Sequence, residues 1–293
     1  MEGLEKTLTQ FHRTIQNGVT PQGIRRFKTI IWNYYKSHGR GFAWRSDIHP
    51  YSILVSEIML QQTQTTHVVQ KYAEWMKAFP NFETLAKAPM KKILEVWQGM
   101  GYNRRAIALK KCAELVLLNY KGKLPKTTDE LIKLPHVGPN TAASIAAFAF
   151  NKPAVFIETN IRSVFITFFF PNKTNVHDND IRELVEKTLD KKNPREWYYA
   201  LMDYGVLLKA TFGNPNKKSR HYTKQSKFAG SNRELRGTIL RELNMSRGLT
   251  IEQLQDKLKK QNIPTTILKL RTTLKSLADE GFVKEKNNRY LIR

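Results

Sequence analysis

Apolar residues recur at helical spacing through most of this sequence, from residue 22 to about residue 210. Prolines and glycines divide the region into short segments with brief connections, and the alternation typical of strands is scarce. The predicted helices are residues 23–37, 51–62, 68–78, 84–88, 90–97, 103–119, 128–133, 139–150, 160–169, 178–189 and 194–208. This pattern predicts an all-α body.

A second, smaller unit follows a change in composition. Residues 211–229 are polar, basic and weakly periodic, which is typical of a linker. Three amphipathic segments come next, with Thr250 placed to cap the second, and an alternating tail has Asn287 and Asn288 at a hairpin turn. Three helices and a β-hairpin predict a winged-helix module. The predicted domains are an amino-terminal extension (1–22), a helical domain (23–212), a basic linker (213–230) and a winged-helix-like domain (231–293).

The charge balance constrains the partner more than the fold. Lys and Arg number 49 against 25 Asp and Glu, a formal net charge of +24. Such an excess favours polyanionic partners, nucleic acid first. The sequence shows neither an apolar run of membrane-spanning length nor a signal-peptide pattern at its start. We therefore expect an intracellular protein. Our further expectation is a monomeric, nucleoid-associated protein of a prokaryotic cytoplasm.

One cysteine, Cys112, is present. A single thiol cannot form an internal disulfide, and it cannot supply a cysteine-ligated zinc or iron–sulfur site within the chain. Cys112 lies in an apolar helical pattern and is expected to be a small core residue. We expect no metal and no cofactor.

The segment LPHVGPNTAAS, residues 134–144, joins two predicted helices. A glycine in a short turn permits unusual backbone torsions, and amide groups ahead of a helix N-terminus bind anions. We interpret it as a helix-hairpin-helix element that holds a DNA phosphate without reading sequence. An ordinary corner between helices is the alternative. The expected hairpin residues are His136, Val137, Gly138, Pro139, Asn140 and Thr141.

The segment YSILVSEIMLQQTQTT, residues 51–66, is apolar on most sides but carries Glu57 in its middle. A buried carboxyl group has a raised pKa, which suits a general acid. The alternative is a glutamate on the one solvent-facing side of the helix. Gln61, Gln62 and Thr63 follow, and such groups can read an extruded base or fill the gap that it leaves.

A second carboxylate, Glu158, closes the apolar stretch KPAVFIE, and Thr159 and Asn160 open the next helix. A carboxylate at that point could be rigidly placed, although on spacing alone capping of the helix is the favoured explanation. Two carboxylates, a phosphate-binding hairpin and base-reading amides are together what N-glycosidic cleavage requires. One acid protonates the leaving base, and a second carboxylate stabilises an oxocarbenium-like sugar, by analogy with glycoside hydrolysis.

Several segments resemble MutY-type adenine DNA glycosylases of the helix-hairpin-helix, or endonuclease III, superfamily, in the same order and spacing. They are WRSDIHPYSILVSEIMLQQTQTTHVVQKY, VWQGMGYNRRAIALKKCA, LPHVGPNTAASIAAFAF, FIETNIRSVF and WYYALMDYGVLLKATFG. The resemblance runs from about Phe27 to Phe212, and its SEIMLQQT motif is highly specific. FAGSNRELRGTIL also resembles the junction in members with a winged-helix tail.

The resemblance implies roles for single residues. Glu57 matches the catalytic acid, and Asn160 matches an asparagine beside the cleaved sugar. Tyr102 matches a residue that wedges into the duplex. Gln61, Gln62 and Thr63 match contacts to the lesion pair and the flipped base, and His136 to Asn140 match the hairpin.

The sequence departs from the family at four places. Glu158 and Thr159 stand where the family has Asp and Gly. The four cluster cysteines are absent, and a basic stretch, residues 217–227, replaces the cluster loop. Asn140 stands where bifunctional relatives carry the Schiff-base lysine, which implies a monofunctional enzyme. We expect no counterpart of the family's 8-oxoguanine-recognition domain after the winged-helix unit.

The resulting hypothesis is a DNA-repair hydrolase, a monofunctional glycosylase that excises adenine from mispairs with 8-oxoguanine or guanine. Two alternatives stay open. The first is a mismatch glycosylase of the same fold that excises uracil, thymine or a modified base. The second is a catalytically silent protein that binds DNA lesions.

Overall fold

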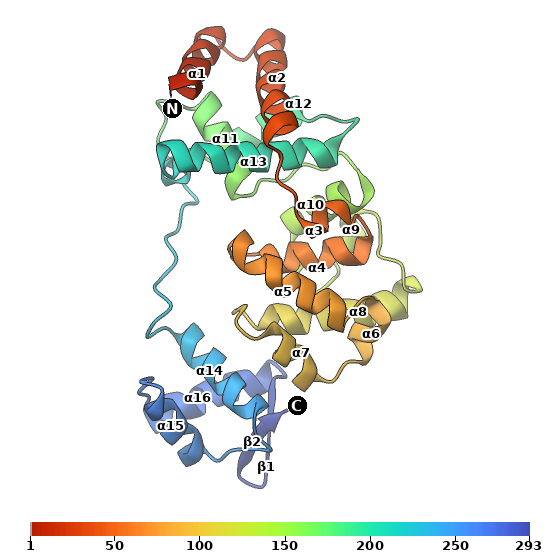
Figure 1. The fold of residues 1–293 in the computed structure, drawn as a ribbon, viewed down its shortest axis with the longest axis vertical. Coiled ribbons are helices and arrows are strands. Elements are labelled where there is room, and N and C mark those ends of the chain that lie inside the picture. The colour runs from red at the N-terminus through yellow and green to blue at the C-terminus, as the bar shows by residue number, and fades with distance from the viewer. Residues whose placement is uncertain (1) are drawn as a thin grey trace. The chain divides into compact units, whose positions relative to one another are not determined.

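The computed structural model describes residues 2–293 and confirms the all-α body with a small hairpin at the carboxyl end (Figure 1). In chain order the elements are α1 (Glu2–Thr14), α2 (Pro21–His38), α3 (Ala43–Ser46), α4 (Pro50–Leu60), α5 (Thr65–Ala78), α6 (Phe82–Lys87), α7 (Met90–Trp97), α8 (Arg104–Tyr120), α9 (Thr128–Leu131), α10 (Pro139–Phe150), α11 (Thr159–Phe169), α12 (Asp178–Thr188), α13 (Pro194–Phe212), the 3-10 helix η1 (Pro215–Lys218), α14 (Asn232–Asn244), α15 (Ile251–Lys260), α16 (Ile267–Asp279), β1 (Val283–Lys286) and β2 (Arg289–Ile292).

The predicted helices match these elements closely, and α7 and α10 agree at both ends. Helix α1 lies in the predicted amino-terminal extension, where no helix was expected. It forms because its apolar side is buried: the Phe11 ring lies 6.1 Å from that of Phe27 and 5.0 Å from that of Phe168. Among residues 2–293, no helix has the length and apolar character needed to cross a bilayer.

The chain folds as two compact units, and the division between them falls inside α4. The first unit contains the residues up to Ile53, Lys126–Lys133 and Val137–Lys224. The second contains Leu54–Pro125, Leu134–His136 and Gln225–Arg293.

An ion cluster anchors the first unit. Asp203 of α13 is only 1% exposed and accepts hydrogen bonds from the guanidinium groups of Arg40 and Arg45 at 2.7–2.8 Å. The backbone amide of Arg40 donates to the same carboxylate at 2.8 Å. These positive partners outweigh burial and lower the pKa of Asp203. The cluster ties the segment before α4 to α13.

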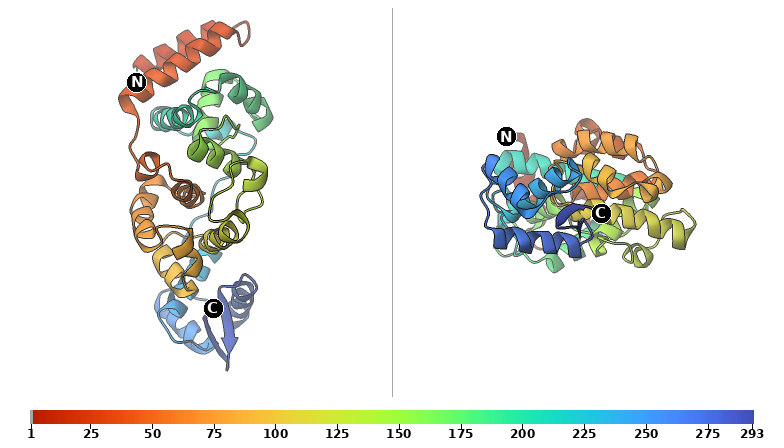
Figure 2. Two further views of the ribbon diagram at one scale, coloured as in Figure 1. Left: turned by 90° about the vertical axis from the view of Figure 1, so that its right-hand side faces the viewer. Right: turned by 90° about the horizontal axis from the view of Figure 1, so that it is seen from below.

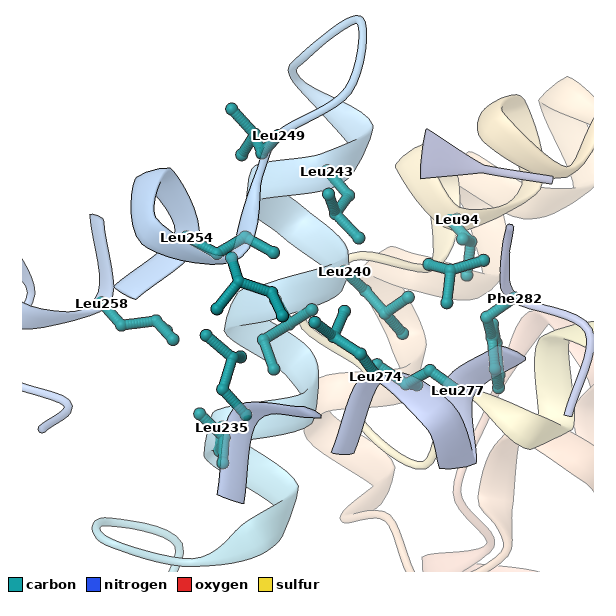
Figure 3. Close-up of a cluster of buried hydrophobic side chains, with 14 of the residues drawn as sticks. Leu94, Leu235, Leu240, Leu243, Leu249, Leu254, Leu258, Leu274, Leu277 and Phe282 are labelled. Atoms are coloured by element: carbon teal, nitrogen blue, oxygen red, sulfur yellow. The ribbon is translucent and has the colours of Figure 1, made fainter. Parts of the chain in front are cut away.

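In the second unit, the elements from α14 to β2 share a core with α7 and α8, and we call them the winged-helix unit after the sequence prediction. Leu94 of α7 and Ile107 of α8 belong to the same buried cluster as Leu240, Leu277 and Phe282. Figure 3 shows Leu94 beside Leu240 and Phe282. Burying such side chains stabilises by about 1.5–3 kcal/mol each. The winged-helix unit is therefore packed onto α7 and α8.

Ion pairs reinforce this packing. Glu280, which follows α16, receives two hydrogen bonds from Arg104 of α8, at 2.7 and 2.8 Å, and one from Arg236 of α14 at 2.6 Å. The Arg104 bonds, helped by Ser276 and Arg236, lower the pKa of Glu280 to about 2. Glu280 thus stays ionised at neutral pH and links α8 to the winged-helix unit.

The hairpin forms where the sequence predicts it. Strands β1 and β2, at the blue end of the chain in Figure 2, pair antiparallel. Lys286 lies opposite Arg289. Asn287 and Asn288 both have positive φ, 51° and 57°, as a two-residue type I′ turn requires. Leu249 and Tyr290 exchange backbone hydrogen bonds at 3.0 and 2.8 Å, which joins the residue before Thr250 to the hairpin.

Candidate functional site

Helix α4 presents Glu57 from an almost wholly buried surface. Residues 51–56, Ile58 and Met59 are buried, and Glu57 is half-buried among them. The helix forms because its apolar residues, with two buried serines, face the core on nearly every side. Glu57 therefore does not lie on a freely solvated face, which was the alternative interpretation of the sequence.

The end of α4 is held by Arg105 of α8, a residue that sequence reasoning did not select. The last carbonyl groups of a helix lack partners within the helix and carry partial negative charge, so a guanidinium suits them. Arg105 is 3% exposed, and burial lowers its pKa to about 10, which leaves it charged at neutral pH. Its acceptors, at 2.6–3.2 Å, are the carbonyl oxygens of Ile58, Met59, Gln61, Met100 and Gly101 and the hydroxyl of Thr63.

The expected base-reading residues, Gln61 to Thr63, directly follow α4 and belong to the second unit. Gln61 also donates from Nε2 to the carbonyl oxygen of His136 at 3.3 Å, and Thr63 is held by Arg105. Gln62 between them is exposed and has a positive φ of 54°. A non-glycine residue in this conformation is uncommon and is maintained by its surroundings. The tight bend presents the Gln62 side chain to solvent.

The hairpin between α9 and α10 has the expected form, with one difference. The left-handed residue is His136, at φ 63°, whereas Gly138 is extended at φ −82° and ψ 177°. Gly138 is exposed, and no described atom lies within 4 Å of where its Cβ would be. The glycine thus provides close access to the N-terminus of α10 rather than an unusual torsion. Among residues 2–293, no side chain caps that terminus.

Glu158 is the N-cap of α11. Its Oε1 accepts hydrogen bonds from the backbone amides of Asn160 at 2.8 Å and Ile161 at 3.0 Å, and its Oε2 accepts from Asn160 Nδ2 at 3.3 Å. The capping interpretation of the sequence is therefore confirmed. Burial raises the pKa of Glu158 despite these bonds and the nearby charge of Arg162. The same contacts fix a carboxylate in one orientation beside Asn160.

The neighbouring Asn140 at the start of α10 donates from Nδ2 to the carbonyl oxygen of Ile157 at 3.3 Å. Asn140 thus contacts Ile157, the residue that directly precedes Glu158. In the first unit the structure brings together Asn140, Glu158 and Asn160. In the second unit it brings together Gln61, Thr63 and His136, with Glu57 one turn before Gln61 on α4.

A glycine in α13 allows the close approach that positions Asn160. A Cβ on Gly205 would lie 2.4 Å from the carbonyl oxygen of Asn160 and 2.7 Å from its Cβ. Real atoms do not approach this closely, so only glycine permits the observed packing of α13 on α11. Sequence reasoning did not select Gly205, because a glycine inside a helix gives no sign of which backbone it faces.

We expect Gly205→Ala to destabilise the protein by about 1–3 kcal/mol through overpacking. We also expect it to lower any activity that depends on Asn160 about tenfold, because displacement of a positioned group is costly. Gly237→Ala is the matched control, since a Cβ there meets no described atom within 4 Å. The control is expected to be neutral or to gain about 1 kcal/mol from helix propensity. Thermal unfolding compares the two, and equal midpoints would contradict the packing argument.

The predicted linker is ordered over its first part. Asn216 in η1 is 4% exposed, and its Nδ2 donates to the carbonyl oxygen of Thr159 at 3.0 Å and to Ser163 Oγ at 2.5 Å. Val176 exchanges backbone hydrogen bonds at 2.9 Å with Lys218 and Arg220. The segment after α13 is therefore attached to the start of α11, where Glu158 and Thr159 lie.

The donor set does not fit the iron–sulfur cluster that the family resemblance implies. Such a cluster needs four thiolates, and the sequence has one cysteine. Cys112 is buried, burial raises its pKa to about 12, and its thiol contacts the carbonyl oxygen of Pro135 at 3.3 Å. Within residues 2–293, no group of three His, Cys, Asp or Glu side chains is arranged to hold a metal ion.

A surface depression in the first unit contains none of the expected site residues. Its volume is about 510 Å³, and Tyr35 donates a hydrogen bond to Glu196 at its edge, at 2.6 Å. We assign it no role. It is lined by Trp32, Tyr35, Lys36, Ser37, Gly39, Arg40, Gly41, Asn193 and Glu196.

The helical body thus has a hairpin ahead of a terminus of α10 without a side-chain cap, and carboxylates on α4 and at the start of α11. Residues 55–191 match the HhH-GPD superfamily of base excision DNA repair proteins. A thymine/uracil-DNA glycosylase of Methanothermobacter thermautotrophicus is 30% identical over 185 residues, which cover 62% of this chain and 84% of that protein. The chain belongs to the HhH-GPD superfamily, as its sequence predicts.

Other similar proteins come from more than one branch of this superfamily. An adenine DNA glycosylase of Buchnera aphidicola (subsp. Baizongia pistaciae) is 35% identical over 187 residues, 62% of this chain and 52% of that protein. The chain thus spans about half the length of that relative. Among solved structures, a thermostable thymine-DNA glycosylase has a TM-score of 0.59 at 28% identity, covering 67% of this chain and 91% of that one. A trapped endonuclease III–DNA intermediate, at 18% identity and TM-score 0.55, covers 74% and 94% and shares the fold.

Proposed function

We propose that the protein is a monofunctional DNA glycosylase that hydrolyses the N-glycosidic bond of adenine mispaired with 8-oxoguanine or guanine. The observation that carries the proposal is Glu57, half-buried on α4, one turn before Gln61, whose carbonyl oxygen Arg105 binds. The similarity to adenine DNA glycosylases supports the choice of base. We infer that the protein acts as a monomer on double-stranded DNA.

In the proposed reaction Glu57 donates its proton to a ring nitrogen of the flipped adenine. The bond between C1′ and the base then breaks, and its electron pair leaves with the adenine. The sugar becomes an oxocarbenium ion, which the Glu158 carboxylate stabilises, and Asn160 orients that carboxylate through its amide. Water loses a proton to Glu57 and adds to C1′, which regenerates the acid.

The proposed DNA contacts follow from charge and backbone geometry. The hairpin residues His136 to Thr141 would hold one phosphate at the N-terminus of α10, where Gly138 leaves room for it. Lys217, Arg220 and Lys224 are exposed on the ordered segment after α13 and would contact further phosphates. Gln61, Gln62, Thr63 and Tyr102 would contact the mispair.

A specific observation favours a second candidate, a thymine or uracil mismatch glycosylase. The archaeal relative with that name is matched over 84% of its length, more than the Buchnera adenine glycosylase at 52%. The Glu158–Thr159 pair and Asn140 also depart from the adenine-specific pattern. The two candidates share the fold and the carboxylates and differ in the base released.

The monofunctional part of the proposal has its own experiment. Wild-type protein is expected to leave an abasic site that breaks only after alkali, and to give no adduct with borohydride, because Asn140 lacks the amine that forms a Schiff base. Asn140→Lys supplies that amine and is expected to give a trapped adduct and strand cleavage. Asn140→Ser is the control and should behave as wild type. Trapping of the wild-type protein would overturn the monofunctional assignment.

A further inference from the structure

The hydroxyl of Tyr102 is bound by one residue of the predicted linker and one residue of α14. Tyr102 lies in the loop between α7 and α8, and its hydroxyl accepts hydrogen bonds from Arg233 Nη1 at 3.0 Å and Gln225 Nε2 at 2.5 Å. The Arg233 guanidinium also lies 5.5 Å from the centre of the Tyr102 ring. Arg233 belongs to the first turn of α14, so the winged-helix unit contacts this tyrosine directly.

The backbone of Tyr102 requires such support. Tyr102 has a φ of +46°, a conformation that large side chains rarely adopt. A second guanidinium, that of Arg105, lies 5.4 Å from the same ring. Because Arg105 also fixes the end of α4, the ring is held between the base-reading segment and the winged-helix unit. The half-buried ring thus has a defined position in the free protein.

Arg233 is itself fixed in place. Its Nη2 donates to the carbonyl oxygen of Ser226 at 2.6 Å and to Ser226 Oγ at 3.3 Å. The helix that carries it is anchored through the shared core with α7 and through the Arg104–Glu280–Arg236 ion pairs. The position of the Tyr102 hydroxyl therefore depends on the docking of the winged-helix unit.

We propose that Arg233 is a positioning residue that holds the Tyr102 ring ready to enter the duplex, and that the winged-helix unit is thereby part of the mispair-recognition site. The inference rests on the proposed function, in which Tyr102 contacts the mispair. A planar guanidinium donates from one nitrogen to the Tyr102 hydroxyl and from another to Ser226 while it lies near the ring, whereas an ammonium group is a single point donor. Arg233 therefore acts through its shape as well as through its charge.

This distinction separates positioning from a plain phosphate contact. Arg233→Lys keeps the positive charge but loses the planar group whose two Nη atoms reach Tyr102 and Ser226 separately. If Arg233 only attracted phosphate, lysine would replace it. Arg241→Met is the matched control, because Arg241 lies in the same helix and is hydrogen-bonded to Gln261 inside the winged-helix unit.

The experiment uses the full chain and a duplex with 2-aminopurine stacked beside the mispair. The fluorescence of 2-aminopurine rises when the neighbouring base is unstacked. With saturating Arg233→Lys protein, the fluorescence increase is expected to be at least about threefold smaller than with wild type. Single-turnover base release is expected to be about tenfold slower. Binding to an undamaged duplex is expected to change less than about twofold. Arg241→Met is expected to retain the wild-type signal. A wild-type fluorescence rise with Arg233→Lys would overturn the proposal.

A double-mutant cycle tests whether Arg233 acts through Tyr102. On a Tyr102→Leu background, Arg233→Lys is expected to lower the fluorescence rise less than about twofold further. The same loss on both backgrounds would show that Arg233 acts elsewhere, and it would overturn the proposal. The fluorescence reading needs no base release. A protein that unstacks the duplex but releases no base would contradict the proposed function alone.

Discussion

Glu57→Gln is expected to abolish base release while leaving DNA binding within about twofold of wild type. The amide cannot donate a proton to the leaving base or take one from water, and general acid–base groups typically contribute about 10²–10⁴-fold. The substitution keeps the shape of the side chain on α4, where the flanking residues are buried. Single-turnover excision, with protein in excess over a mispaired duplex, measures the loss apart from product release.

Glu95→Gln is the control for this prediction. Glu95 on α7 is 57% exposed and pairs with Lys92 at 3.1 Å, so it is a solvated carboxylate in the same compact unit. Its substitution is expected to change excision less than about twofold, because exposed ion pairs contribute little. Undiminished base release by Glu57→Gln would remove Glu57 from the mechanism.

Glu158→Gln has the second largest expected effect, a loss of about 10²–10³-fold in excision, because a preorganised charge facing the developing cation is removed. The amide oxygen of glutamine still accepts hydrogen bonds from Asn160 and Ile161, so the cap of α11 is kept. The loss would then be one of charge and not of helix structure.

The pH dependence follows from the raised pKa of Glu158. The carboxylate has to be ionised to stabilise the oxocarbenium ion, so excision by the wild type is expected to fall as the pH drops through that raised pKa. The charged groups beside it are Arg162, which lowers the pKa, and Asp178, which is paired with Arg162 at 2.7 Å. In Glu158→Gln this acidic limb is expected to disappear.

Whereas excision falls as the pH drops through the raised pKa of Glu158, the contribution of Glu158 to folding stability is expected to rise. A carboxyl group whose pKa is raised by folding stabilises the folded state fully below its unfolded pKa, and that contribution is lost as the pH rises through the folded pKa. Above the folded pKa the buried carboxylate destabilises the folded protein, and Glu158→Gln should keep or raise the melting temperature there. A lowered melting temperature, or an acidic limb unchanged by the substitution, would argue that Glu158 is only a cap.

The helical elements were largely predictable because their signal is local. Helices α7 and α10 follow from periodicity and flanking prolines, and Thr250 caps α15 with a capping box. The Asn287–Asn288 turn follows from the preference of asparagine for positive φ. Helix α1 was missed although Leu4, Leu8 and Phe11 have helical spacing, and its burial depends on aromatic rings far along the chain.

The site was predictable only in part, because several of its supports are long-range. The family and the positions of Glu57 and Glu158 follow from sequence motifs, but their catalytic roles stay predictions. A basic residue in a helix normally faces water, so nothing local reveals that Arg105 is buried against the end of α4. Asn216 lies in a segment with the composition of a linker, and its burial comes from hydrogen bonds to Thr159 and Ser163.

The central claim is tested most directly by identifying the base released from duplexes that differ only in the central pair. The proposal predicts free adenine from mispairs with 8-oxoguanine and guanine, slower or absent release from an adenine–thymine pair, and no adenine with Glu57→Gln. Release of thymine or uracil opposite guanine, with adenine left intact, would contradict the adenine assignment in favour of the second candidate. Release of no base from any of these duplexes would contradict the glycosylase assignment itself.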